Sequence, residues 1–400
     1  MNSPGLITKD IHEQGDKNKQ MKPLEGLLVL EFPQFMAGPT AGLKLADLGA
    51  RVIKIERPYK GEGGRQIAIK NLFIGDDSLV FHTINRNKES YAADLKDEDD
   101  LAKVKKLIAQ ADVMTHNFRP GVMEKIGLTY REVCKINPRI VYGVVTGYGT
   151  KGPWANKPGQ DLLVQSLSGL TWLSGTRDDG PVPFGLAIAD MACGAHLAQG
   201  ILAALLKRNK TGKSVLVEVS LLESVLDLQF ELLTTHLNDG GRLPERSGVR
   251  GGGHPYLSAP YGIYKTSDGY LTLAMGNLLA IGRCLGCDLT SYEHKSSWFK
   301  KRDEIATKLG AHLSNNSTEY WRARLEERGI WCSAVYNYQQ ALQHEAFKAL
   351  GMTQEVKLGD GSGLTTTRSP IQINRQKLYA DKAAPKTGED TDKINSEFNI

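Results

Sequence analysis

One aspartate, Asp190, has the sequence surroundings of a reactive carboxylate. It lies between the apolar run at residues 184–188 and a stretch of small residues at 192–195. A carboxylate in apolar surroundings loses solvation, which raises its pKa and its nucleophilicity, so that it could attack a carbonyl carbon. The alternative is a helix cap, which the spacing alone favours, because Asp accepts hydrogen bonds from the first N–H groups of a helix. Both roles are compatible, since helix-end N–H groups can also hold a reactive carboxylate.

Composition is that of a soluble globular protein. The 400 residues are 40% hydrophobic and 24% charged, which is sufficient for two domains with sizeable cores. A net charge of +5, with cations interleaved among acids, does not favour nucleic-acid binding. Residues 1–20 are polar and predict a flexible tail without a signal-peptide core. We therefore expect a cytoplasmic protein with no membrane partner.

The cysteines give no sign of a disulfide framework or a metal site. There are five, and they are scattered along the chain. Cys284 and Cys287 form an isolated C-x-x-C without a second pair or a neighbouring histidine set. We expect them to be structural, and we expect no bound metal.

The first 150 residues alternate between strand and helix patterns, which predicts an α/β fold with an open, mostly parallel sheet and helices on both faces. No glycine-rich nucleotide motif is present, so a ligand would use other loops beyond the carboxyl ends of the strands. Strands are expected at 27–32, 51–56, 112–115 and 140–146, and helices at 39–48, 98–110 and 130–136.

The second half of the chain predicts a smaller domain. After Asp190 a helical pattern runs to residue 208, followed by a strand at 214–219 and a helix at 221–237. The run Gly251, Gly252 and Gly253 interrupts the pattern. A hairpin with strands at 261–265 and 270–275 and helices at 302–314 and 318–329 then indicate an α+β unit.

A series of short motifs runs along the chain from Leu24 onward. They are Gly-Leu-Leu-Val-Leu-Glu at 26–31, Ala-Gly-Pro at 37–39, Gly-Ala-Arg-Val-Ile-Lys-Ile-Glu at 49–56, Asn-Arg-Asn-Lys at 85–88, Ala-Asp-Val-Met at 111–114, Asn-Phe-Arg-Pro-Gly at 117–121, Asn-Pro-Arg-Ile at 137–140, Gly-Tyr-Gly at 147–149, the Asp190 segment, Thr-Gly-Lys at 211–213 and Gly-Glu-Asp-Thr at 388–391. In this order they resemble the class III CoA-transferases, which include formyl-CoA, carnitine and bile-acid CoA-transferases and the α-methylacyl-CoA racemases. Each motif is weak alone, but their order is specific.

The resemblance implies a particular architecture. A large Rossmann-like CoA-binding domain would combine residues 21–220 and 345–400, with a linker helix and the small domain at 221–344. Two copies would interlock as a homodimer, which buries a large isologous interface. The implied small-molecule partners are an acyl-CoA and a free carboxylic acid, with the CoA thioester as substrate and no tightly bound cofactor.

The resemblance also implies a chemistry for Asp190. Its carboxylate would attack the donor thioester to give an aspartyl anhydride and CoA thiolate, which then form an aspartyl-CoA thioester. The incoming acid would attack that thioester, and the sequence would run backwards. Water must be excluded because each intermediate is an activated acyl group. Gly251, Gly252 and Gly253 are expected to act either as a lid or as a flexible connection between domains.

The implied CoA-binding residues follow the first strands. Arg57, Asn117, Phe118, Arg119 and Lys125 would combine cations for the phosphates with an apolar wall, although Arg119 and Lys125 are equally typical of a solvated helix face. The residues expected near the thioester are Gln34, Met36 and Ala37. Met36 stands where formyl-CoA enzymes have Gln, which weighs against formate or oxalate, and Ile67 replaces a bulky aromatic, which indicates a roomier pocket.

Gln160 bears on the choice between transfer and racemisation. The racemases place a His before an Asp where this chain has Gln160 and Asp161, and Gln cannot exchange a proton near neutral pH. His196 and His254 are candidate replacements for that base, and Asp161 is expected either to support the site or to organise a turn. The hypotheses are therefore a CoA-transferase, a racemase-like enzyme, and a CoA-binding protein without turnover. A second carboxylate, as in succinate, would be held by Arg65, Arg177 or His254.

Overall fold

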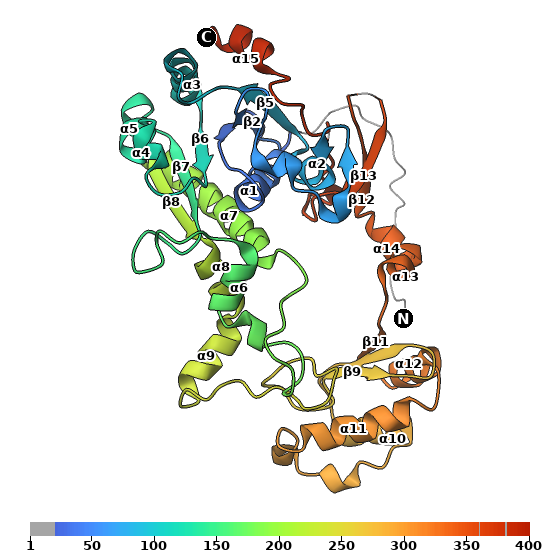
Figure 1. The fold of residues 1–400 in the computed structure, drawn as a ribbon. Coiled ribbons are helices and arrows are strands. Elements are labelled where there is room, and N and C mark those ends of the chain that lie inside the picture. The colour runs from blue at the N-terminus through green and yellow to red at the C-terminus, as the bar shows by residue number, and fades with distance from the viewer. Residues whose placement is uncertain (1–20, 360, 381) are drawn as a thin grey trace, which may run out of the picture.

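A six-stranded sheet forms the centre of the larger of two bodies in the computed structural model, which describes residues 21–400 except 360 and 381 (Figure 1). The predicted tail at 1–20 lies outside the described residues. All neighbouring strands are parallel, which confirms the predicted α/β fold with an open parallel sheet. The strand order is β5 (Lys88–Ala92), β2 (Arg51–Glu56), β1 (Leu28–Glu31), β6 (Val113–His116), β7 (Val141–Thr146) and β8 (Val215–Ser220).

This order places a topological switch point between β1 and β6. Counted along the chain, the sheet strands run 3-2-1-4-5-6, which is the order of doubly wound nucleotide-binding sheets. The connections that leave β1 and β6 go to opposite faces of the sheet, so a crevice opens beyond their carboxyl ends. Ligands of such sheets bind in that crevice.

Helices cover both faces of the sheet. On one face, α1 (Ala37–Asp47) and α7 (Ile188–Thr211) pack against Val29 and Val52. On the other face, α3 (Glu98–Gln110), α5 (Tyr130–Ile136) and α15 (Thr391–Phe398) pack around Leu30 and Ile53. The alternation of successive strand side chains produces these two cores. Helix α7 is long and apolar enough to cross a membrane, but half of its most apolar window is buried against the rest of the protein, as in a core helix.

The C-terminal residues close one edge of the sheet. The Asp390 N–H donates to the Ser90 carbonyl at 3.1 Å, and the Ser90 N–H donates to Asp390 Oδ2 at 2.9 Å. The Tyr91 hydroxyl donates to Asn395 Oδ1 at 2.8 Å. Helix α15 therefore packs beside β5, at the edge of the sheet.

The smaller body has its own core. Its sheet, in the order β11 (Cys332–Ala334), β10 (Tyr270–Leu273) and β9 (Gly262–Lys265), is antiparallel and includes the predicted hairpin. Helices α10 (Leu278–Leu285), α11 (Arg302–Leu313) and α12 (Thr318–Glu327) accompany this sheet. All buried residues of this core come from the chain between Ala259 and Leu325.

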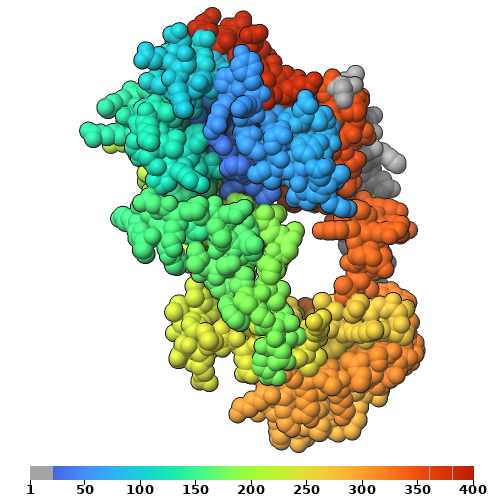
Figure 2. All heavy atoms as spheres, in the orientation of Figure 1, coloured from blue at the N-terminus to red at the C-terminus, as the bar shows by residue number. Residues whose placement is uncertain are grey.

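Two connections join the bodies and leave an opening between them (Figure 2). One contains α6 (Asp161–Leu167), α8 (Leu221–Leu228) and α9 (Phe230–Asn238), so the single helix predicted at 221–237 is interrupted at Gln229. The other contains α13 (Tyr338–Gln343) and α14 (Glu345–Leu350). The remaining helices and strands are β3 (Phe73–Ile74), β4 (Asp77–Ser78), α2 (Leu79–Asn85), α4 (Val122–Lys125), β12 (Thr353–Lys357), β13 (Gly363–Thr367), β14 (Gln372–Ile373) and β15 (Gln376–Lys377).

Candidate active site

Asp190 lies in the first turn of α7 and does not cap it. The N-cap is Ala187, which makes no side-chain hydrogen bond. The Asp190 N–H instead donates to Oδ2 of Asp161 at 3.0 Å. The capping interpretation of Asp190 is therefore wrong, because α7 begins at Ile188 and Asp161 supplies the acceptor at this helix end. The Asp190 carboxylate is left available for other partners.

Asp190 is on the face of α7 that packs against α1. Gly194 lies one turn further along α7, on the same face as Asp190. A Cβ atom on Gly194 would lie 2.6 Å from the Ala37 carbonyl oxygen and 2.7 Å from Cβ of Thr40. The two helices touch at this point, so Asp190 is presented toward the start of α1. Met36 and Ala37, which the sequence placed near the reaction centre, lie at that start.

Burial makes the Asp190 carboxylate unusually basic. Desolvation, with a smaller contribution from the negative charge of Asp161, raises the pKa of Asp190 to about 7. Desolvation also raises the pKa of the neighbouring Cys193 thiol to about 12, so that this thiol stays protonated. Of these two groups, Asp190 is therefore the one that ionises near neutral pH.

Gln165 holds Asp161 in place. Gln165 is 2% exposed, and its Nε2 donates to Asp161 Oδ1 at 2.6 Å. Its Oε1 accepts from the Phe184 N–H at 2.9 Å, and its Nε2 also donates to the Leu186 carbonyl at 3.1 Å. One buried amide thus joins the start of α6 to the segment that leads into α7.

A second pair of loops meets at the switch point of the sheet. The Gln34 N–H donates to Asn117 Oδ1 at 2.9 Å, and Asn117 Nδ2 donates to the Gln34 carbonyl at 2.8 Å. Gln34 follows β1 and Asn117 follows β6, so these bonds tie the two central strand ends together. No side chain caps α1, whose first N–H groups follow this loop.

The other predicted CoA-binding residues lie at the same edge of the sheet. Arg57 follows β2 and is exposed, and Lys125, the last residue of α4, is also exposed. Phe118 is half-buried and stacks on His116 with 6.1 Å between ring centroids. Burial lowers the pKa of His116 to about 4, so this imidazole is neutral. The edge therefore combines exposed cations with an apolar aromatic surface, which suits a phosphorylated nucleotide with an uncharged arm.

The glycine run does not adjoin Asp190 within one chain. Gly252 forms an antiparallel bridge with Gly262, and the Ile263 N–H donates to the Gly251 carbonyl at 2.7 Å. The run therefore lies beside the start of β9 in the smaller body, whereas helix α7 with Asp190 belongs to the larger body (Figure 1). Gln160, in contrast, is exposed at the N-cap of α6, directly beside Asp161.

The residues suggested for a second carboxylate are engaged elsewhere. Arg65 is 2% exposed and forms a bidentate pair with Glu56, at 2.6 and 2.8 Å, so its proposed role in binding an acid is wrong. His254 Nε2 lies 3.2 Å from Oε1 of Glu231. Arg177 is half-exposed and lies 3.5 Å from Asp303, so of the three it remains the one open to solvent.

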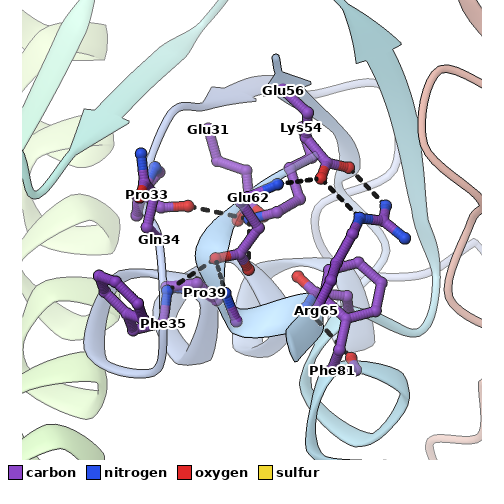
Figure 3. A network of polar contacts seen from close by, with 12 residues as sticks. Glu31, Pro33, Gln34, Phe35, Pro39, Lys54, Glu56, Glu62, Arg65 and Phe81 are labelled. Atoms are coloured by element: carbon purple, nitrogen blue, oxygen red, sulfur yellow. Dashed lines mark hydrogen bonds and ion pairs between the residues drawn. The ribbon is translucent and has the colours of Figure 1, made fainter. Parts of the chain in front are cut away.

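Sequence reasoning missed a buried cluster of charges beside the Gln34 loop. Glu31, Lys54 and Lys88 have no exposed surface. Lys54 Nζ donates to the Pro33 carbonyl at 2.9 Å, and Glu62 accepts from the Phe35 N–H at 2.9 Å (Figure 3). A signal was present in the sequence, because Lys54 interrupts an otherwise apolar strand that should be buried on both faces.

The described part of the chain contains no cluster of three or more His, Cys, Asp or Glu side chains arranged to hold a metal. Cys284 and Cys287 are free thiols in the core of the smaller body.

Comparisons with known proteins agree with this geometry. Residues 24–391 match the model of CoA-transferase family III. The chain is 31% identical to a succinyl-CoA:glutarate CoA-transferase of Mus musculus, over 94% of this chain and 86% of the relative. It is 32% identical to an acetyl-CoA:oxalate CoA-transferase of Acetobacter aceti, over 95% and 97%. A crystal structure of a CAIB/BAIF family protein from Brucella suis superposes with a TM-score of 0.82 at 31% identity, covering 95% of this chain and 100% of that one.

Proposed function

The chain belongs to CoA-transferase family III, and on that premise we propose that it transfers CoA to a free carboxylic acid through covalent intermediates on Asp190. The observation that carries this proposal is the Asp190 carboxyl itself. It lies in the first turn of α7, faces the start of α1, and has a pKa raised to about 7 by burial. A desolvated, basic carboxylate is suited to attack a thioester carbonyl.

In the first half-reaction, an Asp190 oxygen attacks the carbonyl carbon of the donor thioester. The C–S bond breaks, which leaves an acyl-aspartyl anhydride and CoA thiolate. The thiolate then attacks the Asp190 carbonyl carbon of the anhydride, the donor acid leaves as a carboxylate, and an aspartyl-CoA thioester remains. In each step one acyl bond forms as another breaks, so no external oxidant or water is consumed.

In the second half-reaction, the acceptor carboxylate attacks the aspartyl-CoA carbonyl and expels CoA thiolate. The thiolate then attacks the acceptor carbonyl of the new anhydride, which releases the new acyl-CoA and restores the Asp190 carboxylate. The N–H groups at the start of α1 are suited to stabilise the oxyanion that develops in these steps. The loop residues Gln34, Met36 and Ala37 would orient the thioester there.

The acceptor is proposed to be a dicarboxylic acid. The names of two relatives support this proposal, since they give glutarate and oxalate as acceptors. Arg177 is the half-exposed cation suited to the remote carboxylate. Exposed Arg57 and Lys125 would bind the CoA phosphates, with Phe118 against the uncharged arm.

We further propose an interlocked homodimer. The chain encloses an opening (Figure 2) and exposes large apolar side chains along both connections between its bodies. Soluble monomers rarely expose apolar patches of this kind, whereas oligomer interfaces do. The exposed residues include Phe230 at 68%, Leu237 at 70%, Leu243 at 83%, Trp331 at 78% and Tyr338 at 85%. Light scattering of the purified chain should give twice the mass of one chain.

Transfer is favoured over α-proton exchange by the residue beside Asp161. Gln160 offers no titratable group beside Asp161.

Trapping of the intermediate tests the mechanism. The enzyme is incubated with succinyl-CoA, quenched with hydroxylamine and digested, and the Asp190 peptide is examined by mass spectrometry. We expect a hydroxamate on Asp190, no product in Asp190→Asn, and an unchanged yield in Asp99→Asn, a control with an exposed aspartate in the first turn of α3. An unmodified Asp190 peptide from an enzyme that turns over succinyl-CoA would exclude the covalent route.

A further inference from the structure

Six charged side chains are buried together beneath the loop that joins β1 to α1. They form a balanced set of three carboxylates and three cations, as is required for charges that are removed from water. The set consists of Glu31, Lys54 and Lys88, each 0% exposed, and Glu56, Glu62 and Arg65, which are 3%, 5% and 2% exposed.

One of these cations binds the start of the loop, and another binds the first turn of α1. Lys54 Nζ donates to the Pro33 carbonyl at 2.9 Å, and Lys88 Nζ donates to the Pro39 carbonyl at 2.9 Å. Glu31 joins the two ammonium groups, since its Oε1 accepts from Lys54 at 3.3 Å and from Lys88 at 2.8 Å. Hydrogen bonds from an ionised donor are about twice as strong as neutral ones, so both carbonyls are firmly held.

The middle of the loop is held by Glu62. Its Oε2 accepts from the Phe35 N–H at 2.9 Å and from the Gly64 N–H at 2.8 Å, while its Oε1 lies 3.5 Å from Lys54 Nζ (Figure 3). Phe35 has a φ of +67°, which is unfavourable for a bulky side chain. Such a conformation persists only where the surroundings impose it.

Helix α1 rests directly on the same cluster. A Cβ atom on Gly42 would lie 1.8 Å from Oε2 of Glu31, and one on Gly38 would lie 2.2 Å from Cβ of Pro33. The start of α1 therefore has no room to shift while the cluster is intact. Because Gly194, on the same face of α7 as Asp190, touches the start of α1, the cluster would also restrain the α1 N–H groups relative to the carboxylate.

We propose that Lys54 and Lys88, joined through Glu31, are positioning residues that hold the β1–α1 loop and the first turn of α1 in place relative to Asp190. They touch no substrate and act through the carbonyls of Pro33 and Pro39. This inference rests on the proposed function, because it assumes that the reaction takes place at Asp190.

The test removes the Lys88 contact without leaving an unpaired charge. The double variant Lys88→Met with Glu31→Gln is compared with Arg86→Met plus Asp47→Asn, a buried pair at 2.8 Å that touches the other end of α1. We expect the first variant to lower kcat about tenfold or more with KM for the acyl-CoA changed less than about threefold, because positioning acts on the chemical step. The control should keep kcat within about twofold of wild type. Equal losses of kcat in both variants, matched to their losses of Tm, would overturn the inference.

A pH profile of wild type gives a second readout that needs no variant to fold. Desolvation lowers the pKa of Lys88 to about 8, with Lys54 on β2 acting in the same direction and Glu31 on β1 and Glu62 opposing it. The ammonium form holds Pro39, so kcat/KM should fall as the pH rises through about 8. The Lys88→Met, Glu31→Gln variant should lack this alkaline limb. A wild-type profile without the limb, or a variant that keeps it, would contradict the role of Lys88.

These outcomes are distinct from failure of the proposed function. Without an Asp190 hydroxamate in wild type, the covalent mechanism fails whatever the lysines do. With the hydroxamate formed at equal rates in wild type and in the Lys88→Met, Glu31→Gln variant, only the positioning inference fails.

Discussion

Asp161→Asn should shift the acidic limb of the kcat/KM profile to lower pH. Asp161 accepts the Asp190 N–H at 3.0 Å, and its negative charge contributes, after desolvation, to the Asp190 pKa of about 7. Asparagine keeps an acceptor for that N–H, but its amide NH2 replaces the oxygen that accepts from Gln165 Nε2, so the Tm of the variant is measured beside its activity. Loss of the charge should lower the pKa of Asp190 by about one unit, equivalent to about 1.4 kcal/mol.

The size of the effect follows from the ionised fraction. At pH 6 about a tenth of Asp190 is ionised when its pKa is about 7, and about half is ionised when the pKa is about 6. The variant should therefore react about threefold faster at pH 6, because an about fivefold gain in the ionised fraction is offset by an about twofold loss of nucleophilicity. Above pH 8 it should be about twofold slower, because a less basic carboxylate is a weaker nucleophile. The two profiles of kcat/KM should cross.

The assay is the initial rate of CoA exchange between succinyl-CoA and glutarate from pH 5 to pH 9. Asp99→Asn is the matched control and should follow wild type at every pH. Coincident profiles for Asp161→Asn and wild type would show that the Asp161 charge does not raise the pKa of Asp190. A wild-type rate that stays constant from pH 9 down to pH 5 would refute the desolvation of Asp190 itself.

Three further substitutions test separate contacts. Gly194→Ala would bring a Cβ to 2.6 Å from an α1 carbonyl oxygen. We expect the unfolding free energy, measured by urea titration, to fall by about 1–3 kcal/mol. We expect kcat, measured from initial rates, to fall about tenfold. Arg57→Ala should raise KM for acyl-CoA about tenfold with kcat nearly unchanged, because it removes an exposed phosphate partner. Gly42→Ala would place a Cβ 1.8 Å from Glu31 and should destabilise the protein by more than about 2 kcal/mol, whereas Gly180→Ala, with nothing within 4 Å, should be nearly neutral in the same titration.

The sheet could be predicted from sequence because its signals are local. Strands β2 and β7 and helices α3 and α5 are apolar runs or amphipathic patterns whose ends carry caps or turn residues, and their observed bounds match the predicted ones within a residue. Helix α15 has Ile394 and Phe398 on one face, one turn apart, but nothing local in its sequence shows where it packs. It forms where Asp390 and Asn395 meet the edge of β5, a contact across about 300 residues of chain.

The candidate site was only partly predictable for the same reason. The apolar residues around Asp190 adjoin it in the sequence, and they predicted the raised pKa of its carboxyl group. The acceptor of its N–H, Asp161, lies 29 residues away, and no local rule distinguishes it from a turn residue. Lys88 and Glu31 are 57 residues apart, so their pairing appears only once β1, β2 and β5 are adjacent.

The presence of this buried charge cluster requires a reason other than stability. Apolar side chains of similar volume often stabilise a core as well as a buried ion pair does, or better. Such side chains could fill the space of Lys54 and Lys88, but they could not donate to the Pro33 and Pro39 carbonyls. The Pro33 carbonyl belongs to the loop that enters α1, and the Pro39 carbonyl belongs to the first turn of α1. The hydrogen bonds to these two carbonyls thus explain the cluster. A variant with apolar side chains in place of the lysines should fold stably but have a low kcat.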